Sequence, residues 1–161
     1  MDGVARRLSA TVVVAGAGHG AAMVTDEPLS LWGGLDPNTG EVIDRRHPLS
    51  GQCLTGRVLV LPHGRGSCSA SGVLLEAIRN GTAPAAFVTL EIDPIIGLGS
   101  ILGDELYGRP VPVVVLSRAE TALIRDGDYL SVTSDGVVLL ARPAHSTSAD
   151  HTDGCAVEQA G

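Results

Sequence analysis

The sequence predicts an α/β fold, in which strands alternate with helices and an antiparallel hairpin completes the sheet. Three observations predict this. Strand-like and helix-like segments alternate from residue 57 to residue 125, the first third of the chain is rich in short extended segments, and residues 128–140 have the pattern of a hairpin. The chain has 161 residues, a usual length for one compact domain.

The alternating part begins with a strand, a glycine-rich loop and a helix. Residues 57–62 (RVLVLP) are an uninterrupted apolar run typical of a buried strand. The Gly/Ser loop that follows leads to residues 73–80, whose apolar side chains recur at helical spacing until Gly81 ends the helix. Because strand, helix and strand follow one another, we expect the inner strands of the sheet to be parallel.

The remaining elements continue this alternation. Residues 85–90 and 111–116 are apolar runs that predict two strands, and the Asp-Pro pair that opens residues 93–107 is typical of a capped helix. Residues 117–125 begin with a capping box, which predicts a further helix. The hairpin over residues 128–140 turns at a Ser-Asp-Gly sequence.

The N-terminal region predicts a strand and a turn. Residues 8–15 (LSATVVVA) are apolar and β-branched, and we expect this strand to enter a flexible turn at Gly16, Gly18 and Gly20. The glycine run matches the GxGxxA form of the dinucleotide-binding fingerprint. That fingerprint requires a helix directly after the glycines, but Pro28 interrupts the segment, so no nucleotide site is assigned.

The domain is predicted to span residues 1–141, and residues 142–161 are predicted to form a disordered tail. The tail is rich in Pro, Ser, Thr, Asp and His and has little apolar content. His145, His151 and Cys155 lie in it, but an unstructured polar segment with scattered ligand types does not define a metal site.

Composition excludes several functions. The formal net charge is −7, all 11 basic residues are arginines, and aromatic residues make up 2% of the chain. Nucleic-acid binding needs a basic patch and, for single strands, stacking aromatic side chains, so it is excluded. The absence of lysine excludes a P-loop lysine and a lysine Schiff base. Hydrophobic residues make up 44% of the chain, and few of them are aromatic, so the core is predicted to be aliphatic.

The predicted compartment is the cytoplasm. No apolar stretch approaches the roughly 20 residues that a membrane-spanning helix needs, and the N-terminal segment lacks the pattern of a signal peptide. Cys53, Cys68 and Cys155 are an odd number at no metal-like spacing, which favours free thiols over a disulfide framework. We therefore expect a cytoplasmic protein that contacts no membrane.

The candidate functional site is the segment GRGSCSAS, residues 64–71, between a predicted strand and a predicted helix. Backbone N–H groups of a glycine-rich loop and of a first helical turn converge there and create a positive potential. Such a site suits a carboxylate, a phosphate or a developing oxyanion, and it lowers the cost of ionising a serine hydroxyl. Arg65 adds a permanent cation.

Two other interpretations of this segment compete. In the first, Ser69 or Ser71 only caps the helix and the glycines only form a turn. In the second, His63 and the following Gly-Arg-Gly belong to the oxyanion loop of a serine hydrolase. The nucleophile elbow G-x-S-x-G that such an enzyme needs is absent at every serine.

Several separated motifs occur between about Gly16 and Gly136: SLWGGLDP at residues 30–37, HPL at residues 47–49, the GRGSCSAS loop, and NGTAP at residues 80–84. In this order they resemble the small subunit of the aconitase X family. Members of that family are similar to the swivelling domain of aconitases. The resemblance implies a swivelling β/β/α domain that docks onto a large catalytic subunit and closes its active site.

The resemblance also implies a dehydratase that removes water from a hydroxylated carboxylate. In aconitase-like enzymes the serine after the glycine of this loop takes the proton next to a carboxylate, and the corresponding residue here is Ser67. Arg65, Gly66, Cys68 and Ser69 are expected to support the substrate or its oxyanion. Aconitases place a second serine and an arginine directly after the base. This chain has Cys68 and Ser69 there, so the carboxylate clamp of aconitase is not carried over.

The resemblance further implies partners and a substrate. An iron or iron–sulfur centre is expected on the large subunit, and neither a cofactor nor a metal ligand is assigned to this chain. The first motif is expected to form a loop beside the substrate or at the subunit interface. Its expected site residues are Ser30, Trp32, Gly33, Gly34 and Asp36.

Two substrates are associated with the family, cis-3-hydroxy-L-proline in bacterial members and phosphorylated mevalonate in archaeal ones. The Cys68 form of the loop and the LEAIRNGTAP sequence are more similar to the bacterial type. Hydroxyproline is therefore the implied substrate, and phosphomevalonate is the alternative. A hypothesis of another class is a non-catalytic module that binds an anion or regulates an enzyme.

Overall fold

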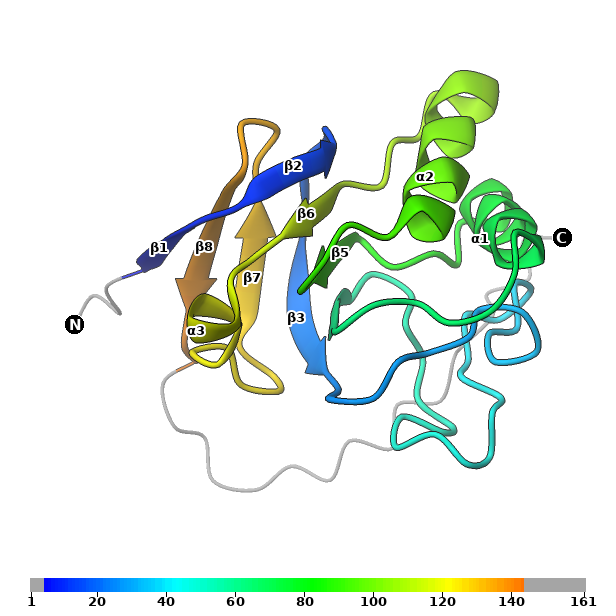
Figure 1. The fold of residues 1–161 in the computed structure, drawn as a ribbon, viewed down its shortest axis with the longest axis horizontal. Coiled ribbons are helices and arrows are strands. Elements are labelled where there is room, and N and C mark those ends of the chain that lie inside the picture. Colours follow the sequence, from blue (N-terminus) through cyan, green and yellow to red (C-terminus); the bar gives the residue numbers. More distant parts are fainter. Residues whose placement is uncertain (1–4, 144–161) are drawn as a thin grey trace, which may run out of the picture.

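The computed structural model describes residues 5–143, and Figure 1 shows their arrangement. The predicted tail, with His145, His151 and Cys155, lies outside the described residues from residue 144 onward. Within the described part, no helix is long and apolar enough to cross a bilayer. The elements are β1 Arg6–Ser9, β2 Thr11–Val14, β3 Gly18–Val24, β4 Val58–Leu61, α1 Ser69–Asn80, β5 Ala86–Thr89, α2 Pro94–Tyr107, β6 Val113–Val115, α3 Arg118–Thr121, β7 Tyr129–Val132 and β8 Val137–Ala141.

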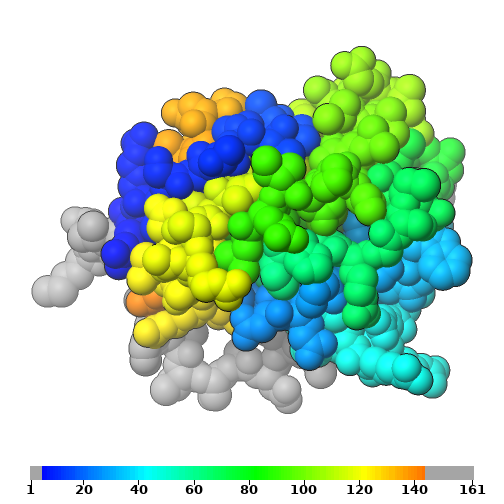
Figure 2. Space-filling model, viewed as in Figure 1, coloured from blue at the N-terminus to red at the C-terminus, as the bar shows by residue number. Residues whose placement is uncertain are grey.

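The sheet closes on itself, because one N-terminal segment forms both of its ends. The strand order is β1-β8-β7-β3-β4-β5-β6-β2, and only Ala10 separates β1 from β2. β1 pairs antiparallel with β8, and β2 pairs antiparallel with β6. In Figure 2 this dark blue segment lies between the orange atoms of the hairpin and the yellow atoms that follow β6. The single strand predicted for residues 8–15 is therefore wrong, since the segment pairs with two different strands.

The glycines expected in a flexible turn lie in or next to β3, so this prediction is also wrong. The first half of β3 pairs antiparallel with β7, and its second half pairs parallel with β4. A Cβ atom at Gly18 would lie 2.1 Å from the Ala85 carbonyl oxygen, and one at Gly20 would lie 2.2 Å from that of Gly56. Glycine is needed here because neighbouring backbone approaches closely, and no helix follows as a dinucleotide site would require.

Strands β4, β5 and β6 are buried on both faces and separate two cores. In β4, Val58 and Val60 face the core between the two halves of the sheet, whereas Leu59 and Leu61 face the helices. The pairs β3–β4, β4–β5 and β5–β6 are parallel, which confirms the prediction for the inner strands. The layers are thus sheet, sheet and helices, the β/β/α order that the resemblance implies.

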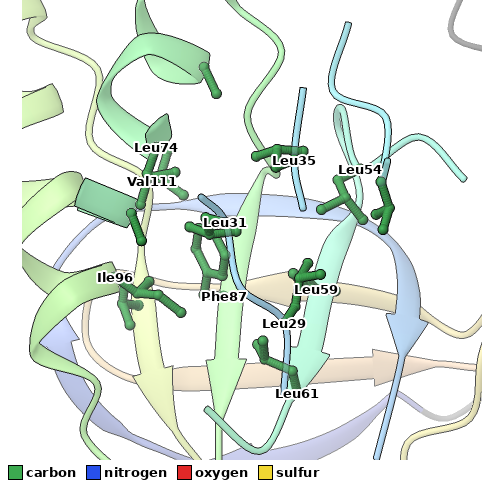
Figure 3. Packing of buried hydrophobic residues seen from close by; sticks show 14 of the residues in the cluster. Leu29, Leu31, Leu35, Leu54, Leu59, Leu61, Leu74, Phe87, Ile96 and Val111 are labelled. Atoms are coloured by element: carbon green, nitrogen blue, oxygen red, sulfur yellow. The ribbon is translucent and has the colours of Figure 1, made fainter. Parts of the chain in front are cut away.

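Helices α1 and α2 pack against each other on the outer face of the parallel strands. A Cβ atom at Gly99 would lie 3.0 Å from Leu74, so the glycine lets the two helices approach closely. Figure 3 shows Leu74 and Ile96 near Phe87 in this core. The capped start of α2 is confirmed, whereas α1 begins at Ser69, earlier than predicted, and α3 is shorter than predicted.

Replacement of Gly20 by alanine is expected to destabilise the domain. The new Cβ atom would overlap the carbonyl oxygen of Gly56, which lies just before β4, at a cost of about 3 kcal/mol or more in the free energy of unfolding. Gly72 is the matched control, because it is exposed in α1 and a Cβ atom added there would meet no other atom within 4 Å. Gly72→Ala is expected to stabilise by about 0.5–1 kcal/mol. Denaturant unfolding that shows equal effects for both variants would contradict the close approach.

Candidate active site

The candidate site lies where the parallel strands end. The loop that carries Ser67 leaves the carboxyl end of β4, and the neighbouring loop after β5 runs beside it, with the Leu90 amide donating to the Pro62 carbonyl at 3.0 Å. Ligand sites commonly lie at the carboxyl ends of parallel strands, in open sheets and in barrels, because the loops from adjacent strands meet there. The fold thus brings the segment singled out in the sequence to a position suited to binding.

One side of the loop is held by the segment around Ser30. Leu29 and Leu31 are buried in the core next to the helices, as Figure 3 shows, so the serine between them faces the loop. The Arg65 amide donates to the Leu29 carbonyl at 3.0 Å. Gly66 has φ of +113°, and a Cβ atom there would lie 3.1 Å from the Ser30 hydroxyl oxygen. The loop therefore requires a glycine at residue 66, both for its positive φ and for the space beside Ser30.

The other side of the loop is held by the first turn of α2. The Gly64 amide donates to Oδ2 of Asp93 at 2.5 Å, and Oδ1 of the same carboxylate accepts from the amides of Ile95 and Ile96. The Ser71 hydroxyl donates to the Ile95 carbonyl at 2.7 Å. Sequence reasoning recognised Asp93 only as a helix cap. Its contact with the Ser67 loop could have been found from its position after β5, the strand beside β4, because the loops after both strands lie at the same edge of the sheet.

Ser67 is exposed, and its hydroxyl has no hydrogen-bond partner among residues 5–143. Helix α1 has Cys68 at its N-cap without a side-chain cap, and Ser71 bonds to α2 instead. The interpretation of Ser69 or Ser71 as a mere helix cap is therefore wrong. Within the described part of the chain, nothing accepts from the backbone N–H groups of residues 66 to 69, which are left to face an anion.

The surroundings of this loop favour negative charge. Helix α1 has 12 residues, and its N-terminal dipole adds to the unpaired N–H groups at its start. The Arg65 side chain is exposed and forms no salt bridge within residues 5–143. A carboxylate or an alkoxide placed at Ser67 would thus meet donors and a cation.

The structure brings together some of the other residues singled out in the sequence and not all of them. A Cβ atom at Gly34 would lie 2.0 Å from the Ser30 carbonyl oxygen, so this glycine shapes the turn beside the loop, in which Gly33 has φ of +71°. Trp32 is 64% exposed at this turn. The Asp36 side chain instead accepts from the Asn38 amide in a turn of its own, so nothing links it to Ser67 directly.

One of the two cysteines in the described residues differs from expectation. Cys68 is a free thiol, as the cysteine spacing favours, and it is exposed. Cys53 is disulfide-bonded, which contradicts the expectation of free thiols at that position.

The described residues form a site that is open and carries no metal ligands. Residues 5–143 contain no group of three or more His, Cys, Asp or Glu side chains that could hold a metal ion. Two surface cavities, of about 320 Å³ and about 520 Å³, are lined by other residues and do not contain Ser67. Residues 65 to 69 are exposed, whereas a small-molecule site normally buries most of its ligand, so this loop forms one wall of such a site.

The layer order and the serine exposed before α1 define a swivel-type β/β/α domain. Residues 7–140 match the family model described as the aconitase X swivel domain, and the chain belongs to this family.

Curated relatives carry this domain in two forms. The chain is 43% identical over 145 residues to the cis-3-hydroxy-L-proline dehydratase of Pseudomonas aeruginosa, and the match covers 86% of this chain but only 25% of that protein. It is 54% identical over 113 residues to the phosphomevalonate dehydratase small subunit of Methanopyrus kandleri, covering 68% of this chain and 84% of that protein. The domain therefore corresponds to part of one enzyme and to most of a subunit of another.

A solved structure supports the family assignment. Holo aconitase X from Thermococcus kodakaraensis contains a chain that matches 85% of this chain and 99% of its own length, with a TM-score of 0.76 and 31% identity.

Replacement of Gly66 by alanine is expected to distort the loop. A side chain at φ of +113° is strained, and we expect a loss of about 1–3 kcal/mol in the free energy of unfolding. Gly51→Ala, also at positive φ but with open space around its Cβ position, is the matched control. Only Gly66→Ala is expected to shift the amide NMR signals of residues 64 to 71. Equal shifts from the control would contradict the specific requirement for glycine beside Ser30.

Proposed function

We propose that this chain is the swivelling part of a dehydratase that removes water from a hydroxylated carboxylate, with Ser67 as the general base. The observation that carries the proposal is the exposed Ser67 hydroxyl, unpaired within the described residues and beside backbone N–H groups without acceptors. Membership of a family whose relatives are dehydratases or their small subunits supports it. We place the enzyme in the cytoplasm.

The role of Ser67 is proton transfer. Its ionised hydroxyl takes the proton from the carbon next to the substrate carboxylate, and the electron pair of that C–H bond forms a double bond. The hydroxyl group on the next carbon leaves with its own bonding pair and, after gaining a proton, becomes water. Arg65 and the N–H groups of Gly66, Cys68 and Ser69 stabilise the negative charge at the loop before the proton is taken.

The partner in this proposal is a large catalytic subunit that completes the site. Residues 65 to 69 of the loop are exposed, so a second surface must cover the substrate. Trp32 and Ile92 are 64% and 65% exposed, and both lie in segments that hold the loop. Tryptophan is enriched among the residues that anchor protein interfaces, and we propose that Trp32 and the neighbouring apolar Ile92 contact the partner. We place on the partner the iron or iron–sulfur centre that the family resemblance implies.

The proposed substrate is cis-3-hydroxy-L-proline, and the alternative is phosphomevalonate. The first is supported by the match to the hydroxyproline dehydratase over 86% of this chain. The second is supported by the higher identity, 54%, to a phosphomevalonate dehydratase small subunit. Assay of the assembled enzyme on both compounds decides between them, because only the true substrate is expected to be turned over at a useful rate.

A non-catalytic module that binds an anion is the alternative of another class. Calorimetric titration of the isolated chain with either carboxylate separates the two functions. A half-site is expected to bind weakly by itself, since the second wall is missing. Tight binding without a partner would favour the module.

Ser67→Ala is expected to lower kcat of the assembled enzyme by about 100-fold to 10,000-fold, because a positioned general base contributes about this much. Complex formation should be unchanged, since only one hydroxyl is removed. Ser134→Ala is the matched control, because Ser134 is an exposed serine in the turn between β7 and β8. Retention of most activity by Ser67→Ala would remove this residue from the role of base.

Trp32→Ser and Ile92→Ser are each expected to weaken association with the large subunit by about tenfold or more, because both side chains are proposed interface anchors. Leu106→Ser is the matched control, since Leu106 is 60% exposed near the C-terminal end of α2, away from the loop. Binding measured by surface plasmon resonance should change by no more than about twofold for this control. Similar losses for all three variants would contradict the proposed interface.

A further inference from the structure

We propose that Asp93 is a positioning residue for Ser67: one carboxylate oxygen caps helix α2 and the other fixes the loop through the Gly64 amide. The inference rests on the proposed function of Ser67 and adds to it a buried residue that does not touch the substrate. Gly64 and Asp93 lie in two loops that leave neighbouring parallel strands, β4 and β5, at one edge of the sheet.

The two oxygens of Asp93 have separate partners. Oδ1 accepts from the Ile95 amide at 2.9 Å and from the Ile96 amide at 3.0 Å, whereas Oδ2 accepts from the Gly64 amide at 2.5 Å. The residue is 6% exposed, and no cation is paired with it within residues 5–143. A buried carboxylate is costly unless hydrogen bonds satisfy it, so these three amides hold it in one orientation.

The residue opposite Oδ2 is a glycine for a steric reason. A Cβ atom at Gly64 would lie 2.8 Å from Oδ2 of Asp93 and 3.3 Å from Cδ1 of Ile96. Any side chain there would force the carboxylate away from the amide. The contact thus requires glycine on one side and an acceptor oxygen on the other.

This contact fixes the start of the segment that leads to Ser67. The loop is fixed to the first turn of α2 at both ends, by Asp93 at Gly64 and by the Ile95 carbonyl at Ser71. Between these points the Arg65 amide donates to the Leu29 carbonyl, and the Ser67 and Cys68 carbonyls accept from the amides of Ala70 and Ser71 at the start of α1. Loss of the bond at Gly64 frees the segment before Ser67, and a displacement of about 1 Å at a catalytic group is enough to cost about 100-fold in rate.

The test separates the two oxygens. In Asp93→Ser the hydroxyl still caps α2, because serine is a good N-cap, but the acceptor for Gly64 is lost. Asp93→Asn is the isosteric second variant, in which an amide nitrogen replaces one of the two acceptor oxygens. Ser117→Ala removes the cap of α3 and is the control for loss of helix capping alone. All variants are made in the full chain and assembled with the large subunit.

We expect Asp93→Ser to lower kcat by about tenfold to 100-fold, with KM changed by less than about threefold. Ser117→Ala is expected to leave kcat unchanged. In the full chain without its partner, NMR should show faster hydrogen exchange at the Gly64 amide in Asp93→Ser, whereas the amides of Ile95 and Ile96 stay protected. In a Ser67→Ala background, Asp93→Ser should cause no further loss of kcat, because both act through one hydroxyl.

The outcomes distinguish this inference from the proposed function. If Ser67→Ala abolishes turnover but neither Asp93 variant lowers kcat, the positioning role is overturned and the base assignment stands. The role is also overturned if Gly64 exchange does not change, or if Ser117→Ala lowers kcat as much as Asp93→Ser. If Ser67→Ala keeps its activity, the proposed function is overturned, and the positioning role with it.

Discussion

Burial of β4 on both faces is the constraint on which the rest of the structure depends. Alternate side chains of this strand enter two different cores, one enclosed by the closed sheet and one covered by α1 and α2. A one-residue slip would exchange the two sets of side chains, so the register of the strand is strongly fixed. The carboxyl end of β4, and with it the start of the Ser67 loop, is therefore held in one place.

The loop itself has little apolar content and is held by backbone and polar contacts from two neighbouring segments. The Leu29 carbonyl accepts from Arg65 on one side, and the Asp93 carboxylate accepts from Gly64 on the other. The amides of residues 66 to 69 have no acceptor within residues 5–143, because they lie at the start of α1, where a helix leaves its first N–H groups unpaired. A loop that is held on both sides and carries unpaired donors is suited to stabilise negative charge.

Local patterns were sufficient to predict much of the fold. Burial and helix capping depend on residues that are adjacent in the sequence. For this reason the apolar runs predict β4, β5 and β6, and the Asp-Pro pair predicts the start of α2. The Gly/Ser loop was also found in this way, since its glycines and its place before a helix are local features. Resemblance to the family then supplied the role that is proposed for Ser67.

The predictions that failed depend on residues far apart in the sequence. The glycines of β3 are required by the backbones of Ala85 and Gly56, and the break at Ala10 arises because β1 and β2 pair with different strands. The contact between the second oxygen of Asp93 and the Gly64 amide was missed for the same reason, since Gly64 lies in another loop. Sequence periodicity contains no information on such approaches.

The most direct test is a structure of this chain assembled with its large subunit and a bound hydroxy acid. If Ser67 is the base, its Oγ atom should lie within about 3.2 Å of the carbon that loses the proton, or reach it through one water molecule. An Oγ atom that points to bulk solvent or bonds to its own helix, with the substrate held elsewhere, would contradict the assignment.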